Sequence, residues 1–259
     1  MKRTTQAIAL VLVLLLTLSG CSRGGSEAGR AEGEYQTIEL TMAVNGTDTQ
    51  MDSRVANYFA DLVEERSRGK VTVAVFPNDQ LAGGNASKGL TYLGSFHNGF
   101  RQITNSKRPI KAPTDLQNLK IRVPGSEIYM GFFRTLGADP TSMSWSEVFT
   151  AIQQGTIDGQ ENGVSVTYTA KMAEIQDYLT MWNYSYENNL FIANTLVWES
   201  LEPKTQELLR ACAKEACQWG RDTLESEEAV LLEGFKAMGM EITYLCAACS
   251  RLPRRSARS

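Results

Sequence analysis

Residues 38–76 read IELTMAVNGTDTQMDSRVANYFADLVEERSRGKVTVAVF, and their pattern sets the class of fold. Residues 38–44 alternate apolar and polar side chains as a strand does, whereas residues 52–68 carry apolar side chains at helical spacing. A second strand-like run, residues 71–76, ends at Pro77. A strand, a helix and a strand within about forty residues predict a βαβ unit with parallel strands, and hence an α/β fold.

Asn45 directly follows the first of these strands, in the turn signal Asn45-Gly46-Thr47. In open parallel sheets, ligands bind beyond the carboxyl ends of the strands. Asn45 is therefore a candidate polar contact for a ligand at that end of the sheet. After the helical run, Gly69 has the character of a helix cap.

Strand and helix patterns keep alternating along the rest of the chain. Strand character is found in residues 100–104, 119–123, 139–143, 156–157 and 178–194, and helical spacing in residues 127–136, 145–154, 164–178 and 203–238. Ser144 and Glu147 have the spacing of a capping box, which makes Glu147 a capping residue and not an acid catalyst. Trp145, Trp182 and Trp198 are expected in the core and not as ligand platforms.

The stretch QQGTIDGQENG, residues 153–163, is rich in amides, acids and glycines. We interpret it as the end of a helix, a short strand that begins at Thr156, and a polar loop at the carboxyl end of that strand. Asn162 lies at the end of this loop. Considered alone, Asn162 is typical of a turn, whereas its place beyond a strand end would let its amide contact a ligand.

Composition disfavours several classes of function. The chain has 259 residues, a net charge of −3 and a pI of ≈ 5.4, so it lacks the basic surface that binds nucleic acid. Its single histidine, His97, is interpreted as a loop residue. The sequence contains no metal-ligand cluster and no G-x-S-x-G motif, which argues against a metal site, a metal cofactor and a secreted hydrolase.

Four cysteines follow position 21. Cys212 and Cys217 are five residues apart in a helical stretch, which places them on different faces and argues against a disulfide between them. Cys246 and Cys249 form a CxxC motif without a second pair or a nearby histidine. A zinc site is therefore not expected there.

The first 21 residues have the pattern of an export signal. Two basic residues precede an apolar run that is too short for a convincing transmembrane helix, and Leu-Ser-Gly-Cys ends at Cys21. This ending resembles the lipobox of bacterial lipoproteins, in which lipidation of the cysteine anchors the mature chain to a membrane. The alternative is a plain secretory signal with an incidental cysteine. Residues 22–34, rich in Gly, Ser, Glu and Arg, are expected to form a flexible tether.

Several collinear segments resemble the solute-binding proteins of TRAP transporters, of the DctP type. They are FPNDQL (76–81), GFRQITNSKRPI (99–110), DLQNLKIRVP (115–124), LGADPTSMSWSEVFTAIQQGTIDGQEN (136–162) and residues 171–179. The resemblance implies a two-lobed α/β periplasmic-binding-protein fold whose cleft closes on a small organic acid. It also implies delivery of that acid to the small and large membrane subunits of the transporter. We expect a monomeric, membrane-anchored periplasmic or extracytoplasmic receptor without enzymatic activity.

The resemblance also assigns roles to four residues. Arg122, in IRVP, pairs with the ligand carboxylate, Asn162 contacts the ligand, Arg101 is a second cation near the cleft, and Asn45 is a polar contact after the first strand. A planar guanidinium donates two parallel hydrogen bonds to a carboxylate, which lysine cannot do. The alternative for Arg122 is a structural ion pair, which is common for arginines at strand ends.

The two acids of the stretch 153–163, Asp158 and Glu161, would repel an anionic ligand if they faced it. We therefore expect both carboxylates to point away from the ligand, into the loop and hinge. Asn162, between these acids and the next helix, is the residue of this stretch that we expect to face the ligand.

The resemblance divides the chain into a first lobe and crossover, residues 35–123, and a second lobe with hinge helices, residues 124–243. Residues 85–98 replace several strands and helices of the family, so we expect an incomplete first lobe with exposed strand edges. Residues 244–259 do not resemble the family and are expected to be disordered. A truncated receptor that binds no ligand is therefore the alternative function.

Overall fold

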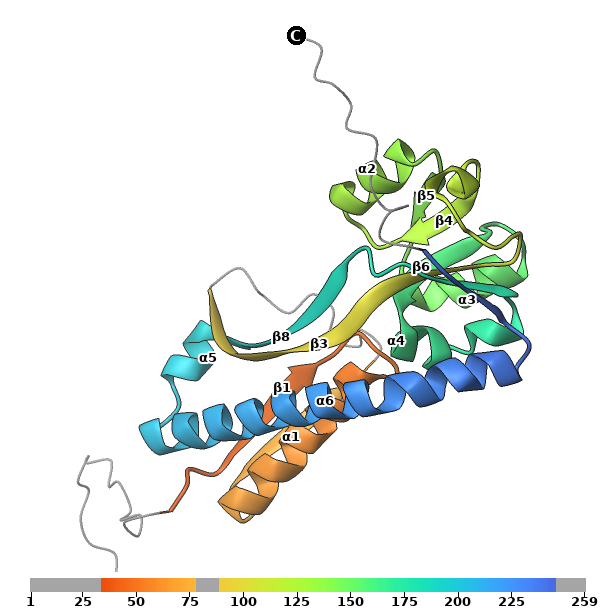
Figure 1. Cartoon of the computed structure of the whole chain (residues 1–259). Coiled ribbons are helices and arrows are strands. Elements are labelled where there is room, and N and C mark those ends of the chain that lie inside the picture. Colours follow the sequence, from red (N-terminus) through yellow and green to blue (C-terminus); the bar gives the residue numbers. More distant parts are fainter. Residues whose placement is uncertain (1–33, 78–88, 246–259) are drawn as a thin grey trace, which may run out of the picture. The chain divides into compact units, whose positions relative to one another are not determined.

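The computed structural model describes residues 34–77 and 89–245, in which strands and helices alternate (Figure 1). The strands are β1 (Ile38–Ala43), β2 (Val71–Phe76), β3 (Leu90–Asn105), β4 (Lys120–Val123), β5 (Asp139–Ser142), β6 (Gly159–Gly163), β7 (Tyr178–Met181), β8 (Tyr186–Asn194) and β9 (Glu241–Tyr244). The helices are α1 (Met51–Ser67), α2 (Glu127–Thr135), α3 (Trp145–Gln153), α4 (Val164–Thr169), α5 (Thr195–Glu199) and α6 (Pro203–Ala237), with short 3-10 turns at Pro113–Leu116 and Met172–Glu174. The predicted α/β class is confirmed.

The βαβ unit is present as predicted. β1 and β2 pair in parallel along their whole length, and α1 connects them. α1 buries the apolar face predicted from its spacing, including Val55, Phe59 and Val63, and packs against α6. Arg68 and Gly69, with φ angles of 56° and 74°, turn the chain from α1 into β2. Gly69 therefore lies in the turn that ends the helix, where the left-handed conformation favours glycine.

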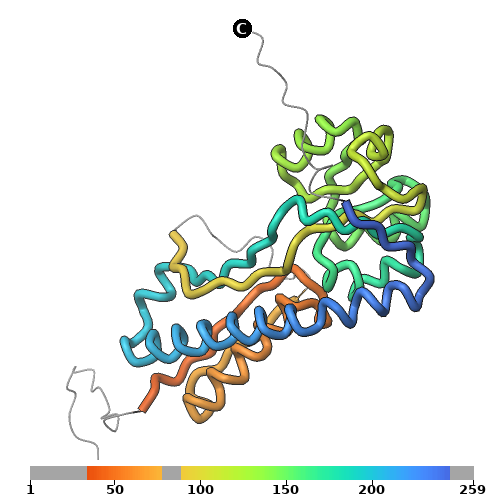
Figure 2. The backbone as a smooth tube through the Cα atoms, in the orientation of Figure 1, coloured from red at the N-terminus to blue at the C-terminus, as the bar shows by residue number. Residues whose placement is uncertain are grey.

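β3 belongs to two parts of the structure (Figures 1 and 2). Its first part forms an antiparallel ribbon with β8, whereas its segment from Arg101 to Asn105 pairs with β6 and β7. The predicted strand 100–104 is thus only the end of a 16-residue strand. Register shifts near Gly94 and Gly99 interrupt the alternation of side chains, which explains why sequence periodicity missed most of β3.

The second sheet surrounds the end of β3. Its order is β5-β4-β6-β3-β7-β9, with β8 paired to β3. The β4–β5, β4–β6 and β7–β9 pairs are parallel, whereas β3 is antiparallel to both of its neighbours in this order. The carboxyl ends of β4 and β6 therefore lie at the same edge of the sheet.

Two large apolar cores lie on this framework. One packs α1, α6 and the β3–β8 ribbon, and includes Phe96 and Phe191. The other packs β3, β4 and α2 around Ile103 and Phe133. The division predicted between residues 123 and 124 does not coincide with these cores, because β8 and α6 follow it in the chain but pack with α1. Among the described residues the sheet beside α1 has two strands, β1 and β2.

Residues 159–163 correct the prediction of a polar loop. They form β6, a central strand between β4 and β3, and all five residues are buried. The prediction was wrong because Gln160 and Glu161 find buried hydrogen-bond partners on neighbouring elements, which no local pattern reveals. The helix that follows is also shorter than predicted, since α4 ends at Thr169 and β7 begins at Tyr178.

Tyr244 and Leu245 are ordered, contrary to the prediction for residues 244–259. Tyr244 ends β9 opposite Met181, and the N–H of Leu245 donates to the Met181 carbonyl at 3.0 Å. The side chain of Leu245 also packs against the core around Phe133. Pairing with β7 thus orders two residues whose composition alone suggested disorder.

The remaining predictions for the chain ends lie outside the described residues. They concern the signal (1–21) with Cys21, the tether (22–33), the tail (246–259), and Cys246 and Cys249. Within the described ranges, Cys212 and Cys217 are buried and form no disulfide with each other. The same ranges contain no helix with the length and apolarity needed to cross a membrane, and no group of three side chains placed to hold a metal ion.

Two glycine-to-alanine changes should have opposite effects on stability: one lies at the contact of β6 with β3, and the other lies on the exposed side of α2. A Cβ at Gly159 would lie 2.1 Å from the Thr104 carbonyl oxygen, so Gly159→Ala should destabilise the fold by about 2 kcal/mol or more. Gly131 is an exposed glycine within α2, with nothing near its Cβ position. Gly131→Ala should therefore stabilise the fold by about 0.5–1 kcal/mol.

Urea unfolding followed by circular dichroism measures both changes. A lower midpoint for Gly159→Ala and a higher one for Gly131→Ala is the expected pair of results. Equal midpoints for Gly159→Ala and the unchanged chain would show that β6 does not pack closely against β3.

Candidate functional site

A cavity of about 430 Å³ lies between the loop after β1, the ends of β4 and β6, and the middle of β8. All four residues expected to contact a ligand line this cavity: Asn45, Arg101, Arg122 and Asn162. They come from the loop after β1 and from β3, β4 and β6. Chain folding thus brings together side chains that are separated by more than a hundred positions in the sequence.

Arg122 is a buried cation. Arg122 is 5% exposed. Its Nε and one terminal nitrogen donate to the Met143 carbonyl at 3.1 and 2.8 Å. Within residues 34–77 and 89–245, no carboxylate lies within ion-pair distance of it, so the alternative of a structural ion pair is not found. Burial lowers the pKa of Arg122 to about 10, as expected for a guanidinium that has lost water without gaining a counter-ion.

Trp145 supports the Arg122 guanidinium. The Cζ atom of Arg122 lies 5.4 Å from the centre of the indole ring, a cation–π geometry. Trp145 begins α3 and is half-buried. It packs against the small core around Val148 and Ile152, as predicted, but it also lines the cavity, which the prediction did not include. The capping box of Ser144 and Glu147 is confirmed, and it places Trp145 at the first position of the helix. Trp198, in contrast, is buried in the core as predicted.

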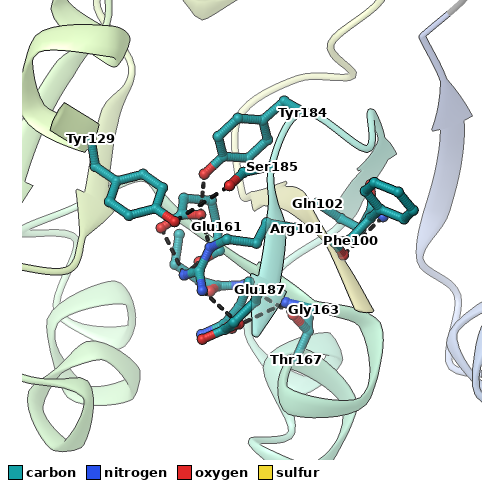
Figure 3. A network of polar contacts seen from close by, with 12 residues as sticks. Phe100, Arg101, Gln102, Tyr129, Glu161, Gly163, Thr167, Tyr184, Ser185 and Glu187 are labelled. Carbon is teal, nitrogen blue, oxygen red and sulfur yellow. Dashed lines mark hydrogen bonds and ion pairs between the residues drawn. The ribbon is translucent and has the colours of Figure 1, made fainter. Parts of the chain in front are cut away.

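Arg101 has two carboxylate partners (Figure 3). Its Nε and one terminal nitrogen donate to Glu161 at 2.5 and 2.9 Å, and its other terminal nitrogen lies 2.6 Å from Glu187. Burial by itself would lower the pKa of Arg101, but the two carboxylates outweigh this effect and raise it. Arg101 therefore lines the cavity as a neutralised cation, unlike Arg122.

The two acids of the stretch 153–163 do not line the cavity, as predicted. Glu161 is fully buried within β6 and accepts hydrogen bonds from Arg101 and the Tyr184 hydroxyl, so it lies in a strand and not in the predicted loop. Burial raises the pKa of Glu161, whereas its contacts with Arg101 and Tyr184 oppose that rise. Asp158 accepts from the Lys120 N–H at 2.9 Å. Both acids thus hold neighbouring strands together.

Asn162 follows Glu161 in β6 and therefore projects from the opposite face of the strand. It is 7% exposed and lines the cavity. Its side-chain oxygen accepts from the N–H of Gly163 at 3.0 Å. The amide NH₂ group is left as the donor that Asn162 can offer to a bound molecule.

Further polar residues of the cavity were missed by the sequence analysis. Gln50, Asn98 and Asn189 each line it, and each has a buried amide atom for which the described part of the chain provides no hydrogen-bond partner. Such atoms are the ones that a bound molecule or water would satisfy. No local signal marked them, because Gln50 precedes α1, and the other two lie in strands whose register the sequence did not reveal.

Comparison with known proteins places the chain in a family. The family model for bacterial extracellular solute-binding proteins, family 7 (DctP), matches residues 84–248. The 2,3-diketo-L-gulonate-binding periplasmic protein YiaO of Escherichia coli K12 is 34% identical over 164 residues, which cover 63% of this chain and 50% of that protein. The C4-dicarboxylate-binding protein DctB of Bacillus subtilis is 28% identical, over 70% of this chain and 69% of its own length.

Solved structures show the same fold. A TRAP periplasmic solute-binding protein from Ralstonia eutropha H16, with bound (S)-2-acetolactate, superposes with a TM-score of 0.77 and 26% identity, over 81% of this chain and 88% of that one. One from Shewanella oneidensis, with bound succinate, has a TM-score of 0.75 and 25% identity, over 82% of this chain and 88% of that one.

These matches differ in how much of the relative they cover. The chain spans about half the length of the E. coli relative, whereas the family match includes the whole seven-stranded region with β4, β6 and their loops. The family consists of solute-binding receptors and not of enzymes. The chain therefore belongs to the bacterial extracellular solute-binding proteins of family 7, the DctP family.

Proposed function

We propose that the protein is an extracytoplasmic receptor that captures a small organic acid through its carboxylate and delivers it to the membrane subunits of a TRAP transporter. The observation that carries this proposal is Arg122, a buried cation on the cavity wall without an anionic partner among the described residues. Relatives named for 2,3-diketo-L-gulonate and C4-dicarboxylates, and solved neighbours with acetolactate or succinate, support an organic acid as the ligand.

Electrostatics favours a carboxylate at Arg122. A buried and unpaired charge costs several kcal/mol, and an anion in the cavity would offset that cost. The Met143 carbonyl and the Trp145 ring hold the guanidinium in place before any ligand arrives. Its remaining N–H groups can then donate to a carboxylate without loss of side-chain freedom on binding.

The other predicted contacts receive distinct roles in this proposal. The NH₂ group of Asn162 donates to the same carboxylate or to a neighbouring hydroxyl. Asn45 contacts the far end of the ligand from the loop after β1. Arg101 contributes by holding the wall of the cavity in shape, since Glu161 and Glu187 already neutralise its charge.

Ligand capture would couple to closure of the two lobes. Asn45 follows β1, which packs with the core of α1 and α6, whereas Arg122 and Asn162 belong to the second sheet. A ligand that touches both groups stabilises the closed arrangement over the open one, which is a population shift. β3 and β8, which run from one core to the other, are the proposed hinge.

We assign the anchor to Cys21 and propose that the mature receptor is a monomeric lipoprotein. The short apolar run before the Leu-Ser-Gly-Cys ending supports lipidation at this cysteine. Relatives named as periplasmic proteins support a place outside the cytoplasmic membrane.

A truncated receptor without ligand binding is the alternative. The chain covers only half of several relatives, and Tyr92, Leu190 and Ile192 of the β3–β8 ribbon are 46–60% exposed. An exposed apolar strand face is typical of a sheet that has lost its covering elements. A melting temperature that no organic acid raises would favour this alternative, since any ligand of the native state must raise it.

Replacing Arg122 by lysine tests the proposed carboxylate contact. Arg122→Lys keeps the charge but loses the paired hydrogen bonds, so affinity for the bound acid should fall about 100-fold or more. Isothermal titration against dicarboxylates, keto acids and sugar acids measures the loss. Arg134→Lys, on the exposed side of α2, is the matched control and should bind as the unchanged chain does.

Two outcomes would contradict this proposal. If the unchanged chain binds no acid of the panel, the receptor function is wrong. If Arg122→Lys retains full affinity, the receptor function stands, but Arg122 is not the carboxylate contact.

The proposed anchor gives a separate prediction. Cys21→Ser should remove the acceptor of the lipid and release the protein from the membrane fraction of expressing cells. Metabolic labelling with a palmitate analogue, followed by fractionation, detects both effects. Labelling that persists in Cys21→Ser would rule out Cys21 as the lipidated residue.

A further inference from the structure

Glu187 places a carboxylate on the wall of the cavity. It lies in β8, lines the cavity, and its side chain is 27% exposed. Its Oε2 atom is 2.6 Å from a terminal nitrogen of Arg101, the guanidinium that Glu161 already engages through two hydrogen bonds. Two carboxylates therefore share one guanidinium, and the formal charges of these three side chains sum to −1.

The charged side chains that line the cavity can accommodate one ligand carboxylate. Among the described residues, two cations line it, Arg101 and Arg122, and so do two acids, Glu187 and Asp52. Asp52 accepts backbone hydrogen bonds in the loop after β1. Arg101 is neutralised by its glutamates, so Arg122 is the one lining cation without an ion pair in the described ranges. One ligand carboxylate satisfies Arg122, and a second would find no free cation among the lining residues that the structure describes.

The rest of the cavity suits neutral hydroxyl groups. Gln50 and Asn98, 4% and 8% exposed, and Asn189, which is two residues beyond Glu187, line it. Each has a buried amide atom that no residue of the described ranges satisfies. Amide donors and acceptors pair well with hydroxyls, which can both donate and accept. A second carboxylate would accept only, and it would be repelled by Glu187.

We propose that Glu187 is a specificity-determining residue, which admits a hydroxylated monocarboxylate and disfavours a dicarboxylate of the same length. The negative charge of Glu187 acts on the part of the ligand that lies away from Arg122. This inference rests on the proposed receptor function and adds the class of acid to it.

Matched acids that differ only in their terminal group test this inference. The pairs are D-erythronate with meso-tartrate and L-galactonate with galactarate, in which a CH₂OH group replaces a second carboxylate. Isothermal titration of the full chain should show, for the pair that binds, that the monocarboxylate is bound at least about tenfold more tightly than its dicarboxylate. Glu187→Gln, which keeps the shape, should reduce that preference about tenfold.

Two control variants separate charge from structure. Glu187→Asp keeps the negative charge and should keep the preference. Glu207→Gln removes the same charge from the exposed face of α6, outside the cavity, and should also keep it. If the thermal melt shows that Glu187→Gln does not fold, the unchanged chain and Glu187→Asp test the inference: both must prefer the monocarboxylate over the dicarboxylate.

The outcomes distinguish a failure of this inference from a failure of the proposed receptor function. A preference of the unchanged chain for the dicarboxylate, or a preference that Glu187→Gln leaves unaltered, overturns the role of Glu187 while the receptor function stands. Failure to bind these acids and every other organic acid overturns the receptor function, and the role of Glu187 with it.

Discussion

The buried ion pair between Arg101 and Glu161 is the interaction on which the site depends. Both side chains are at most 5% exposed, and they join β3 to β6 at the point where β3 enters the second sheet. The Arg101 guanidinium has a second anionic partner in Glu187, and this ion pair brings β8 to the same point. One charge requirement thus joins three strands and shapes the cavity wall.

Arg101 and Arg122 show how partners decide the role of a residue type. Both are buried arginines on the same cavity, 4% and 5% exposed. Glutamates surround Arg101, whereas a backbone carbonyl and an indole ring orient Arg122. Arg101 therefore has a structural role, whereas Arg122 is oriented for an anion that the described residues do not supply.

Local patterns predicted much of the fold. The βαβ unit, the capping box of α3 and most helices follow from spacing that nearby residues set, so they were found correctly. The two misread strands share one cause: β6 and most of β3 are defined by distant strands, so polar residues such as Gln160 resembled a loop. The register shifts near Gly94 and Gly99 hid β3 from any test of periodicity.

The sequence by itself determined the α/β class, the family resemblance and the candidates Asn45, Arg101, Arg122 and Asn162, all of which line the cavity. Only the tertiary structure decided which of the two arginines is already neutralised, and that Glu187 joins the site. The physical reason is that a side chain's charge is readable from its identity, whereas the compensation of that charge depends on groups that folding brings within a few ångströms.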